Sequence, residues 1–295
     1  MPGSLSSVPW SQPVPAGHRP WLWPNLLSLD APLIAVLWLN LFAVSGQVRV
    51  RPAATIVLAL VVWAIYIADR LLDTLHWSGG EGGCPARHRF YRQHRAGFAL
   101  FLLPLLGVIC WFCCNLDRRT LRDGILMLAA VTLYFAAIHH RRSKSRLALP
   151  KEAAVAVLFG AGTYLPAWAH ARSSNAGLDV SVLLFVLLCW VNAALIEYSE
   201  WIRLRLARWR TPHASTVAAG KYLLAIGIAV AVLALCLAAA PAFHAELPIL
   251  AAVALSALAL AGLGFCWRRL AIDQVRVLAD ATLLTPGVIL LLLHR

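Results

Sequence analysis

The sequence has few charged residues. Asp, Glu, Lys and Arg make up 13% of its 295 residues, whereas hydrophobic residues make up 61% and the mean hydropathy is +0.73. A soluble domain carries roughly 25% charged residues, which keep its surface in contact with water. The low charged fraction therefore excludes an ordinary soluble protein and indicates that most of the surface faces lipid.

Acidic residues are especially scarce, with 13 Asp and Glu against 26 Lys and Arg and a formal net charge of +13. A basic balance is also found in nucleic-acid-binding proteins, where Lys and Arg gather on one face or along one helix. Here they fall in short segments between long apolar runs, which is typical of membrane proteins. We therefore expect membrane lipids as surroundings and no nucleic-acid partner.

Paired cysteine motifs and a signal sequence are also lacking. The seven cysteines include no two Cys-x-x-Cys units, so neither a zinc site nor a disulfide framework is indicated. The first 24 residues are rich in Pro, Ser and Trp and lack the basic segment and apolar stretch of a signal peptide. We interpret 1–24 as a disordered tail and 25–295 as a single transmembrane domain.

Apolar runs of about twenty residues, the length that crosses a bilayer as a helix, recur along the rest of the chain. They predict an all-α polytopic membrane protein with nine spans. We place the spans at 26–45, 53–75, 97–114, 121–139, 152–170, 180–201, 219–241, 247–266 and 276–294.

The basic residues indicate an orientation for these spans. If the N-terminus is cytoplasmic, 19 of the 26 Lys and Arg lie in inside segments and 7 in outside segments. An excess of Lys and Arg on the cytoplasmic side is the rule for multi-pass proteins. We therefore expect a cytoplasmic N-terminus, an external C-terminus and a location in a bacterial inner (cell) membrane.

Two acids close the predicted second span, in the stretch AIYIADRLLDTLHW. Asp69 and Asp73 are four residues apart, so both carboxylates project from one helix face. Paired carboxylates suit a hard divalent cation such as Mg²⁺, which in turn binds phosphate oxygens. The alternative is a solvated helix end in which Asp69, Arg70 and Asp73 lie at the membrane surface.

The predicted sixth span closes with VNAALIEYSEWIRLRL, in which Asn192, Glu197 and Glu200 fall within one broad helix face. This set could hold a second Mg²⁺. The alternative is an amphipathic helix end whose acids pair with Arg203 and Arg205.

Arginines follow both acidic segments on the predicted cytoplasmic side, among them Arg87 and Arg89 after the first and Arg203 after the second. Guanidinium groups bind phosphate in bidentate geometry, so acids for Mg²⁺ beside arginines for phosphate predict a diphosphate site. Positive-inside topology alone would also place these arginines there.

Groups at the start of other spans could add to this site. Lys151 opens the predicted fifth span and Arg276 the ninth, and both are candidate phosphate contacts. An intrahelical pair of Arg276 with Asp280 at i, i+4 is the alternative. Asp30 stands near the start of the first span, where a helix-start role suffices.

The stretch IYIADRLLD resembles the first Asp-rich motif of the UbiA superfamily of intramembrane prenyltransferases. Asp69, Arg70 and Asp73 match the family's ADRxxD form, while Ile65 and Tyr66 stand where Asn and Asp are expected. The opening of the first span, LLSLDAPLIAVL, is similar to the family's opening with a Pro after charged residues. The second motif departs further, since Asn, Glu and Glu replace the family's Asp residues.

The resemblance implies nine spans, an internal N-terminus and Mg²⁺-assisted departure of diphosphate from a polyprenyl donor, followed by alkylation of an aromatic or lipid acceptor. It implies that Asp69 and Asp73 bind the first Mg²⁺, with Asn192, Glu197 and Glu200 at a second. Arg70, Arg87, Arg89 and Lys151 would contact phosphate.

Three other functions stay open at this point. A membrane terpene cyclase of the same superfamily would have the same diphosphate site. A non-catalytic prenyl-lipid-binding protein would fit the departures from both motifs. An ion-coupled transporter would also use acids within spans.

Overall fold

The computed structural model describes residues 20–75, 86–140, 151–170, 176–203 and 212–293. Within these ranges every regular element is a helix. Residues 1–19 of the predicted tail lie outside the described residues, while 20–24 form the 3-10 turn η2 (Pro20–Leu22) and the start of α1 (Trp23–Leu26).

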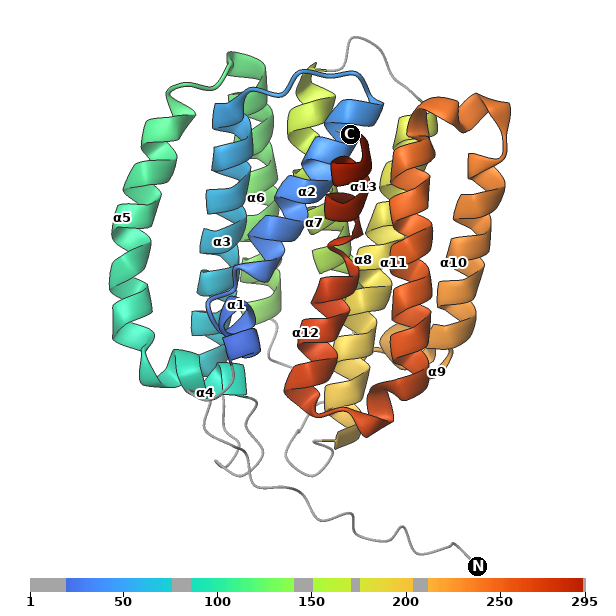
Figure 1. Ribbon diagram of the computed structural model, residues 1–295. Helices are drawn as coiled ribbons and strands as arrows, with labels where there is room; N and C mark the ends of the chain where they lie inside the picture. Colours follow the sequence, from blue (N-terminus) through green and yellow to red (C-terminus); the bar gives the residue numbers. More distant parts are fainter. Residues whose placement is uncertain (1–19, 76–85, 141–150, 171–175, 204–211, 294–295) are drawn as a thin grey trace, which may run out of the picture.

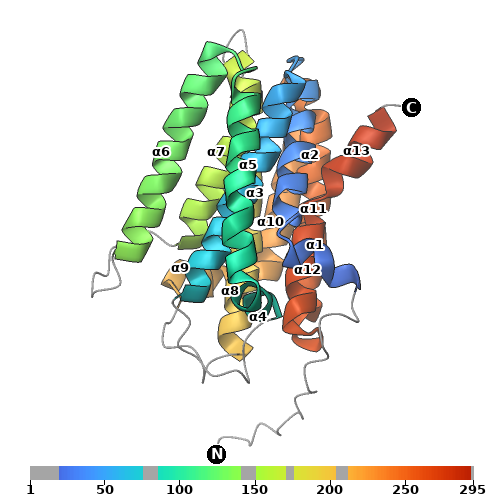
Figure 2. The same ribbon diagram turned by 90° about the vertical axis from the view of Figure 1, so that its left-hand side faces the viewer.

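The long helices run side by side to form a bundle (Figures 1 and 2). Closely packed pairs include α10 with α11, α7 with α8, α3 with α5 and α6 with α7. The helices that follow η2 and α1 along the chain are α2 (Asp30–Ser45), α3 (Pro52–Leu75), α4 (Ala86–Gln93), α5 (Arg95–Cys113), α6 (Arg118–His140), α7 (Lys151–His170), α8 (Ala176–Arg203), α9 (Ala214–Lys221), α10 (Leu223–Ala238), η4 (Pro241–Glu246), α11 (Leu247–Cys266), η5 (Trp267–Arg269), α12 (Ile272–Thr282) and α13 (Thr285–Leu293).

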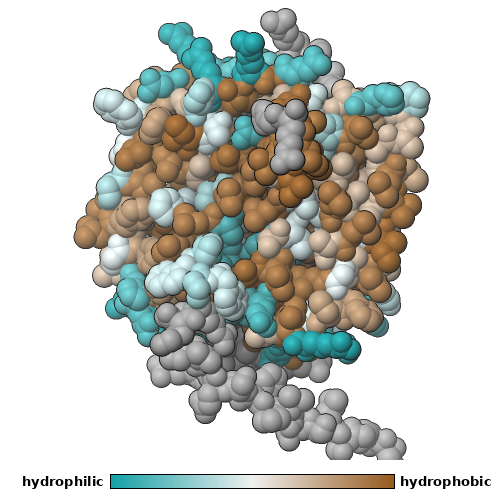
Figure 3. All heavy atoms as spheres, in the orientation of Figure 1, coloured by the Kyte–Doolittle hydropathy of each residue, from teal (hydrophilic) through white to brown (hydrophobic). Residues whose placement is uncertain are grey.

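Six of the described helices, counted with short continuations, are long and apolar enough to cross a membrane. The number rises to eight if each of two bent helix pairs forms one span. On the face seen in Figure 3, hydrophobic residues form a broad band, and hydrophilic residues gather mainly above and below it. The chain is therefore an all-α, multi-pass membrane protein, as the composition predicts. The candidate spans are Pro52–Thr74, Arg95–Cys113, Arg118–Ala137, Ala176–Arg203, Pro241–Arg269 and Ile272–Leu293.

The nine predicted ranges each coincide with a helix or with consecutive helices, but three of them are broken. The first begins at the last residue of α1 and continues through α2, and the chain bends by 77° between η2–α1 and α2. The seventh begins within α9 and continues through α10, and the bend between these two helices is 79°. The ninth comprises α12 and α13, which are separated at Leu283 and Leu284. Since α7 is not among the eight candidates, the count of nine spans stays a prediction.

The bend between α1 and α2 is built around Ser28. Its φ of 54° lies in the left-handed region, which turns the chain between the two helices. The Ser28 hydroxyl lies 3.0 Å from the Tyr91 hydroxyl of α4. This contact links the bend to α4, which lies sideways at the lower end of the bundle (Figure 1).

Aromatic packing fills the centre of the bundle. The indole of Trp38 in α2 stacks on Phe185 in α8, with ring centroids 4.2 Å apart. Its Nε1–H donates to the carbonyl oxygen of Leu283 at 2.9 Å. The break before Pro286 frees that carbonyl from helical pairing, and an unpaired carbonyl within a membrane is costly. Trp38 therefore stabilises the break in the last span.

Candidate functional site

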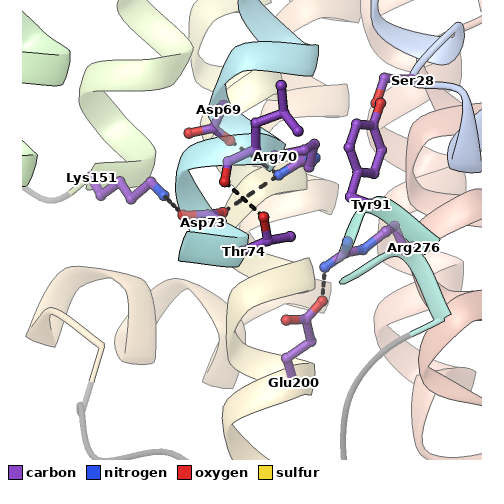
Figure 4. A network of polar contacts seen from close by, with 10 residues as sticks. Ser28, Asp69, Arg70, Asp73, Thr74, Tyr91, Lys151, Glu200 and Arg276 are labelled. Atoms are coloured by element: carbon purple, nitrogen blue, oxygen red, sulfur yellow. Dashed lines mark hydrogen bonds and ion pairs between the residues drawn. The ribbon is translucent and has the colours of Figure 1, made fainter. Parts of the chain in front are cut away.

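Asp69, Arg70 and Asp73 form a compact ionic group at the lower end of α3 (Figure 4). Arg70 Nη1 lies 3.1 Å from Asp69 Oδ2 and 4.0 Å from Asp73 Oδ2. The two acid side chains keep 21% and 29% of their surface exposed, so a ligand can reach them. The predicted common face of the two carboxylates is what lets one guanidinium contact both.

A second cation reaches this group from α7. Lys151 is the first residue of that helix, and its Nζ lies 4.0 Å from Asp73 Oδ1. Its side chain is 42% exposed, and exposed ion pairs contribute little to stability. Lys151 therefore stays available to an anionic ligand beside Asp73.

Arg87 on α4 is a buried cation close to the same group. Its side chain is 9% exposed, and its Nε has no hydrogen-bond partner among the described residues, as is also true of Arg70 Nε. Burial, together with the charge of Arg70, lowers the pKa of Arg87 to about 9, against the opposing charges of Asp73, Asp30 and Asp69. Arg87 thus stays charged at neutral pH, with an N–H group that lacks an acceptor.

The carboxylates of Asp69 and Asp73 suit a Mg²⁺ ion that is also bound by phosphate. Mg²⁺ is commonly held by one or two carboxylates together with phosphate oxygens and waters. Asp69 and Asp73 provide two such carboxylates. Within the described ranges no group of three His, Cys, Asp or Glu side chains converges on one point. The residues present therefore fit a Mg²⁺ that shares its coordination with a phosphate, and not a site built from protein ligands alone.

Two of the three residues predicted for a second Mg²⁺, Asn192 and Glu200, connect α8 to α12. Asn192 Nδ2 donates to the carbonyl oxygen of Ala279 at 2.7 Å. Glu200 forms an ion pair with Arg276, and both side chains are almost fully buried (Figure 4). Glu197 is half-buried on α8. Since Asn192 and Glu200 already have these contacts, the second metal set stays a prediction.

The other predicted phosphate contacts are distributed over the lower end. Arg276 pairs with Glu200, so the alternative of an intrahelical pair with Asp280 is not what the structure has. Arg203 Nη2 donates to the carbonyl oxygen of Trp267 at 2.5 Å and lies over its ring. Arg89 is half-buried on α4. Of these arginines, Arg276 and Arg203 hold neighbouring helices together.

A second acidic centre, which was not predicted from the sequence, lies where α1, α2 and α12 meet. Asn25 Nδ2 donates to Asp30 Oδ2 at 2.6 Å and to Asp280 Oδ2 at 3.2 Å. The Asn25 amide thus brings the carboxyl groups of Asp30 and Asp280 close together. Both acids stand within predicted spans, where acids are costly, and that signal could have identified them.

Tyr66 lies between the two acidic centres. Arg70 of the first centre lies over its ring, 5.6 Å from the centroid. The charges of Asp280 and Asp30 from the second centre also act on its phenol. Tyr66 stands where the resembled motif has an acid.

The chain matches no protein-family model, no curated protein and no solved structure. Assignment of a function therefore depends on the chemistry of this site.

Proposed function

We propose that this protein is an intramembrane prenyltransferase. It would remove diphosphate from a polyprenyl diphosphate with the help of Mg²⁺ and transfer the prenyl group to an aromatic or lipid acceptor. The observation that carries the proposal is the group of Asp69, Arg70 and Asp73 beside Lys151, together with the Nε atoms of Arg70 and Arg87, which are buried and have no hydrogen-bond partner among the described residues. The resemblance of IYIADRLLD to the UbiA superfamily supports it.

Each side chain has a role in this proposal. Asp69 and Asp73 hold Mg²⁺, which when bound neutralises charge on the departing diphosphate. Arg70 and Arg87 donate N–H groups to phosphate oxygens, which gives their unpartnered Nε atoms acceptors. Lys151 contributes a further cation at the exposed side of Asp73. These groups are already positioned before the reaction begins, so they can stabilise the negative charge that develops on the leaving diphosphate.

The apolar surroundings suit a prenyl chain. The apolar spans α3, α5 and α6 are little buried, with 11%, 11% and 17% of their spanning residues enclosed by protein. A hydrocarbon chain could therefore lie along them, next to the ionic group at the end of α3.

The same proposal includes the finer points of topology. Nine spans, a cytoplasmic N-terminus and a bacterial inner membrane would place the Asp69–Asp73 centre on the cytoplasmic side. The excess of basic residues at that end supports this orientation.

A second candidate is a non-catalytic protein that binds prenyl diphosphate. The contacts of Asn192 with Ala279 and of Glu200 with Arg276 favour it, because they occupy residues where the resembled family holds a second Mg²⁺. Binding without turnover would identify this function, and a cyclic hydrocarbon product would identify a terpene cyclase. Ion-coupled transport would be indicated by ion flux in vesicles.

The first experiment measures binding of farnesyl diphosphate to the purified full-length protein with and without Mg²⁺. Asp69→Asn and Asp73→Asn should each weaken Mg²⁺-dependent binding by at least about tenfold, because each removes a metal ligand while keeping its shape. Asp123→Asn is the matched control. Asp123 is a buried acid that pairs with Arg122 near the start of α6, at the end of the bundle opposite Asp69 and Asp73.

The control variant should bind like the wild type. Equal binding by the wild type and both site variants, or no binding by the wild type with or without Mg²⁺, would contradict the proposed diphosphate site. Products from binding-competent protein would then be separated by chromatography with a set of lipid and phenolic acceptors.

A further inference from the structure

Helix α4 carries arginines on two opposite faces. Its buried face contains Arg87 and Tyr91, and the Tyr91 hydroxyl lies 3.0 Å from that of Ser28. Arg89 is two residues from both Arg87 and Tyr91, so it lies on the opposite side of the helix, with Arg92 on the adjoining turn. Arg89 and Arg92 are half-buried, whereas Arg87 is 9% exposed. The outer face of α4 is therefore basic.

This outer face lies where the chain meets the membrane surface. The candidate span Pro52–Thr74 ends shortly before α4, and the next candidate span begins at Arg95, directly after it. Between these two spans α4 lies sideways at the lower end of the bundle (Figure 1). A short helix that connects the ends of two spans in this way lies at the level of the lipid headgroups.

Tryptophans flank the basic face. The ring of Trp23 in α1 meets Phe90 of α4 edge to face, with centroids 5.8 Å apart, and Phe90 packs in turn on Phe98 of α5 at 5.8 Å. Trp21 and Trp23 keep 39% and 42% of their surface exposed. Exposed tryptophans are typical of the boundary between the lipid headgroups and the hydrocarbon core. They indicate the same level for α4 as the two span ends do.

The positive charge of this region is not balanced by nearby acids in the chain. Residues 86–116 include four arginines and no Asp or Glu. Arg95 is exposed, and neither Arg89 nor Arg95 forms an ion pair with another described residue. Anionic phospholipids supply negative charge at the level where these arginines lie, and they attract basic residues close to the membrane.

We propose that the outer face of α4 and the start of α5 bind the headgroups of anionic phospholipids. The guanidinium groups of Arg89, Arg92 and Arg95 donate N–H groups to the headgroup phosphate. Trp21 and Trp23 pack against the glycerol region and the upper part of the acyl chains.

The two faces of α4 then bind different phosphates. Arg87 on the inner face belongs to the proposed diphosphate site, whereas Arg89, which the resemblance assigns to that site, binds lipid on the outer face. Because α4 packs against α3, a lipid on the outer face also holds Arg87 near the end of α3. Lipid binding itself requires neither Mg²⁺ nor a prenyl diphosphate.

The test is native mass spectrometry of the purified full-length protein, titrated in detergent with phosphatidylglycerol or with phosphatidylcholine of the same acyl chains. The wild type should bind phosphatidylglycerol at least about tenfold more tightly. Arg89→Gln/Arg95→Gln should weaken phosphatidylglycerol binding by about 25-fold, since each arginine near a headgroup contributes about fivefold. Its binding of phosphatidylcholine should stay within about twofold of the wild type.

Arg268→Gln/Arg269→Gln is the matched control. Arg268 and Arg269 are exposed arginines of η5 at the same end of the bundle, so this variant removes the same charge away from α4. It should bind phosphatidylglycerol within about threefold of the wild type. Arg89→Lys/Arg95→Lys keeps the charge and should retain the preference for phosphatidylglycerol, which separates a loss of charge from a loss of folding.

Three results would overturn the inference. The wild type would bind both lipids equally, or the two glutamine variants would lose phosphatidylglycerol to the same extent, which would reflect net charge alone. In the third, inorganic diphosphate with Mg²⁺ would displace the lipid, which would place Arg89 and Arg95 in the diphosphate site. A failure of the farnesyl diphosphate experiment would overturn the proposed function and leave lipid binding standing.

Discussion

Glu200 and Arg276 form an ion pair between α8 and α12, with side chains 2% and 4% exposed. The attraction within a buried pair is offset by the cost of removing both charges from water. Loss of one partner therefore matters more than loss of both, because the remaining charge is left without its counter-charge. This residue pair holds α12 in the position that places Asp280 beside Asp30.

We expect Arg276→Met to destabilise the protein by about 3–5 kcal/mol, because it leaves the Glu200 carboxylate buried without its cation. The double variant Arg276→Met/Glu200→Met should be closer to the wild type than the single variant. Unfolding in a denaturing detergent, followed by the fluorescence of the 12 tryptophans, measures both. A double variant less stable than Arg276→Met would contradict this account.

Asp117 is a residue whose charge should make stability depend on pH. It precedes α6 and accepts from the backbone N–H of Thr120 at 2.9 Å and from its hydroxyl at 2.7 Å. His170 Nε2 of α7 lies 3.1 Å from Asp117 Oδ2. Burial raises the pKa of Asp117, but the hydrogen bonds from Thr120 and the charge of His170 lower it further, so it lies below its ordinary value.

Since the folded pKa is the lower one, ionised Asp117 stabilises the protein above the ordinary Asp pKa of about 3.9. This contribution is lost as the pH falls through the folded pKa. Asp117→Asn keeps an oxygen to cap α6 but removes the charge. Its melting temperature should lie below that of the wild type at neutral pH, and the gap should narrow at acid pH, below the ordinary Asp pKa. A gap that is the same at both pH values would show that the charge contributes nothing.

At the scale of helices, apolar runs were sufficient to locate the bundle. Each predicted range coincides with helical elements because a run of about twenty apolar residues can satisfy its backbone within lipid only as a helix. The bends at Ser28 and Tyr222 were not predictable in this way. Hydropathy reports how apolar a segment is and carries no information on the direction of the chain.

The site was predictable in part for a related reason. Asp69 and Asp73 are four residues apart, so helical geometry alone brings them together. Asp30 and Asp280 are brought together by packing between α2 and α12. The local sequence around either acid therefore does not predict that the other lies nearby. The partner of Arg276 was likewise set by tertiary contact, with Glu200 in place of the nearby Asp280.

Helix α9 packs against α8 through Gly220. A Cβ atom at this position would lie 2.2 Å from the ring of Tyr198, a distance that requires the ring or the helix to move. Gly220→Ala should destabilise the protein by about 1–3 kcal/mol through overpacking. The matched control is Gly262→Ala in α11, where a Cβ would meet no atom within 4 Å.

In the control, alanine should be neutral or slightly stabilising, since it favours a helix by about 1 kcal/mol over glycine. Both variants can be compared in the same detergent-unfolding assay. Equal stability of Gly220→Ala and Gly262→Ala would contradict the tight α8–α9 contact.

At the scale of the whole molecule, the number of spans decides where the termini lie. Eight spans would place both termini on the same side of the membrane, whereas nine place them on opposite sides. Within the described residues, α1 lies at the lower part of the bundle and α13 at the upper part (Figure 1). The parity can be measured without any knowledge of function.

We expect alkaline phosphatase, which is active only outside the cytoplasm, to be active when fused after residue 295 and inactive when inserted within 141–150. Green fluorescent protein fused to the N-terminus should fluoresce, since it folds in the cytoplasm. Inactive phosphatase at the C-terminus together with a fluorescent N-terminus would indicate an even number of spans.

The contact of Asn25 with Asp280 also has a consequence for synthesis, because the two residues are 255 positions apart. Chains are made and folded from the N-terminus, so the first helices enter the membrane long before α12 exists. Until α12 is made, Asn25 lacks its hydrogen bond to Asp280, and Glu200 lacks its ion pair with Arg276. Arrival of α12 completes both pairings at once, so a chain stopped before α12 would display unpaired polar groups that a membrane quality-control protease can recognise.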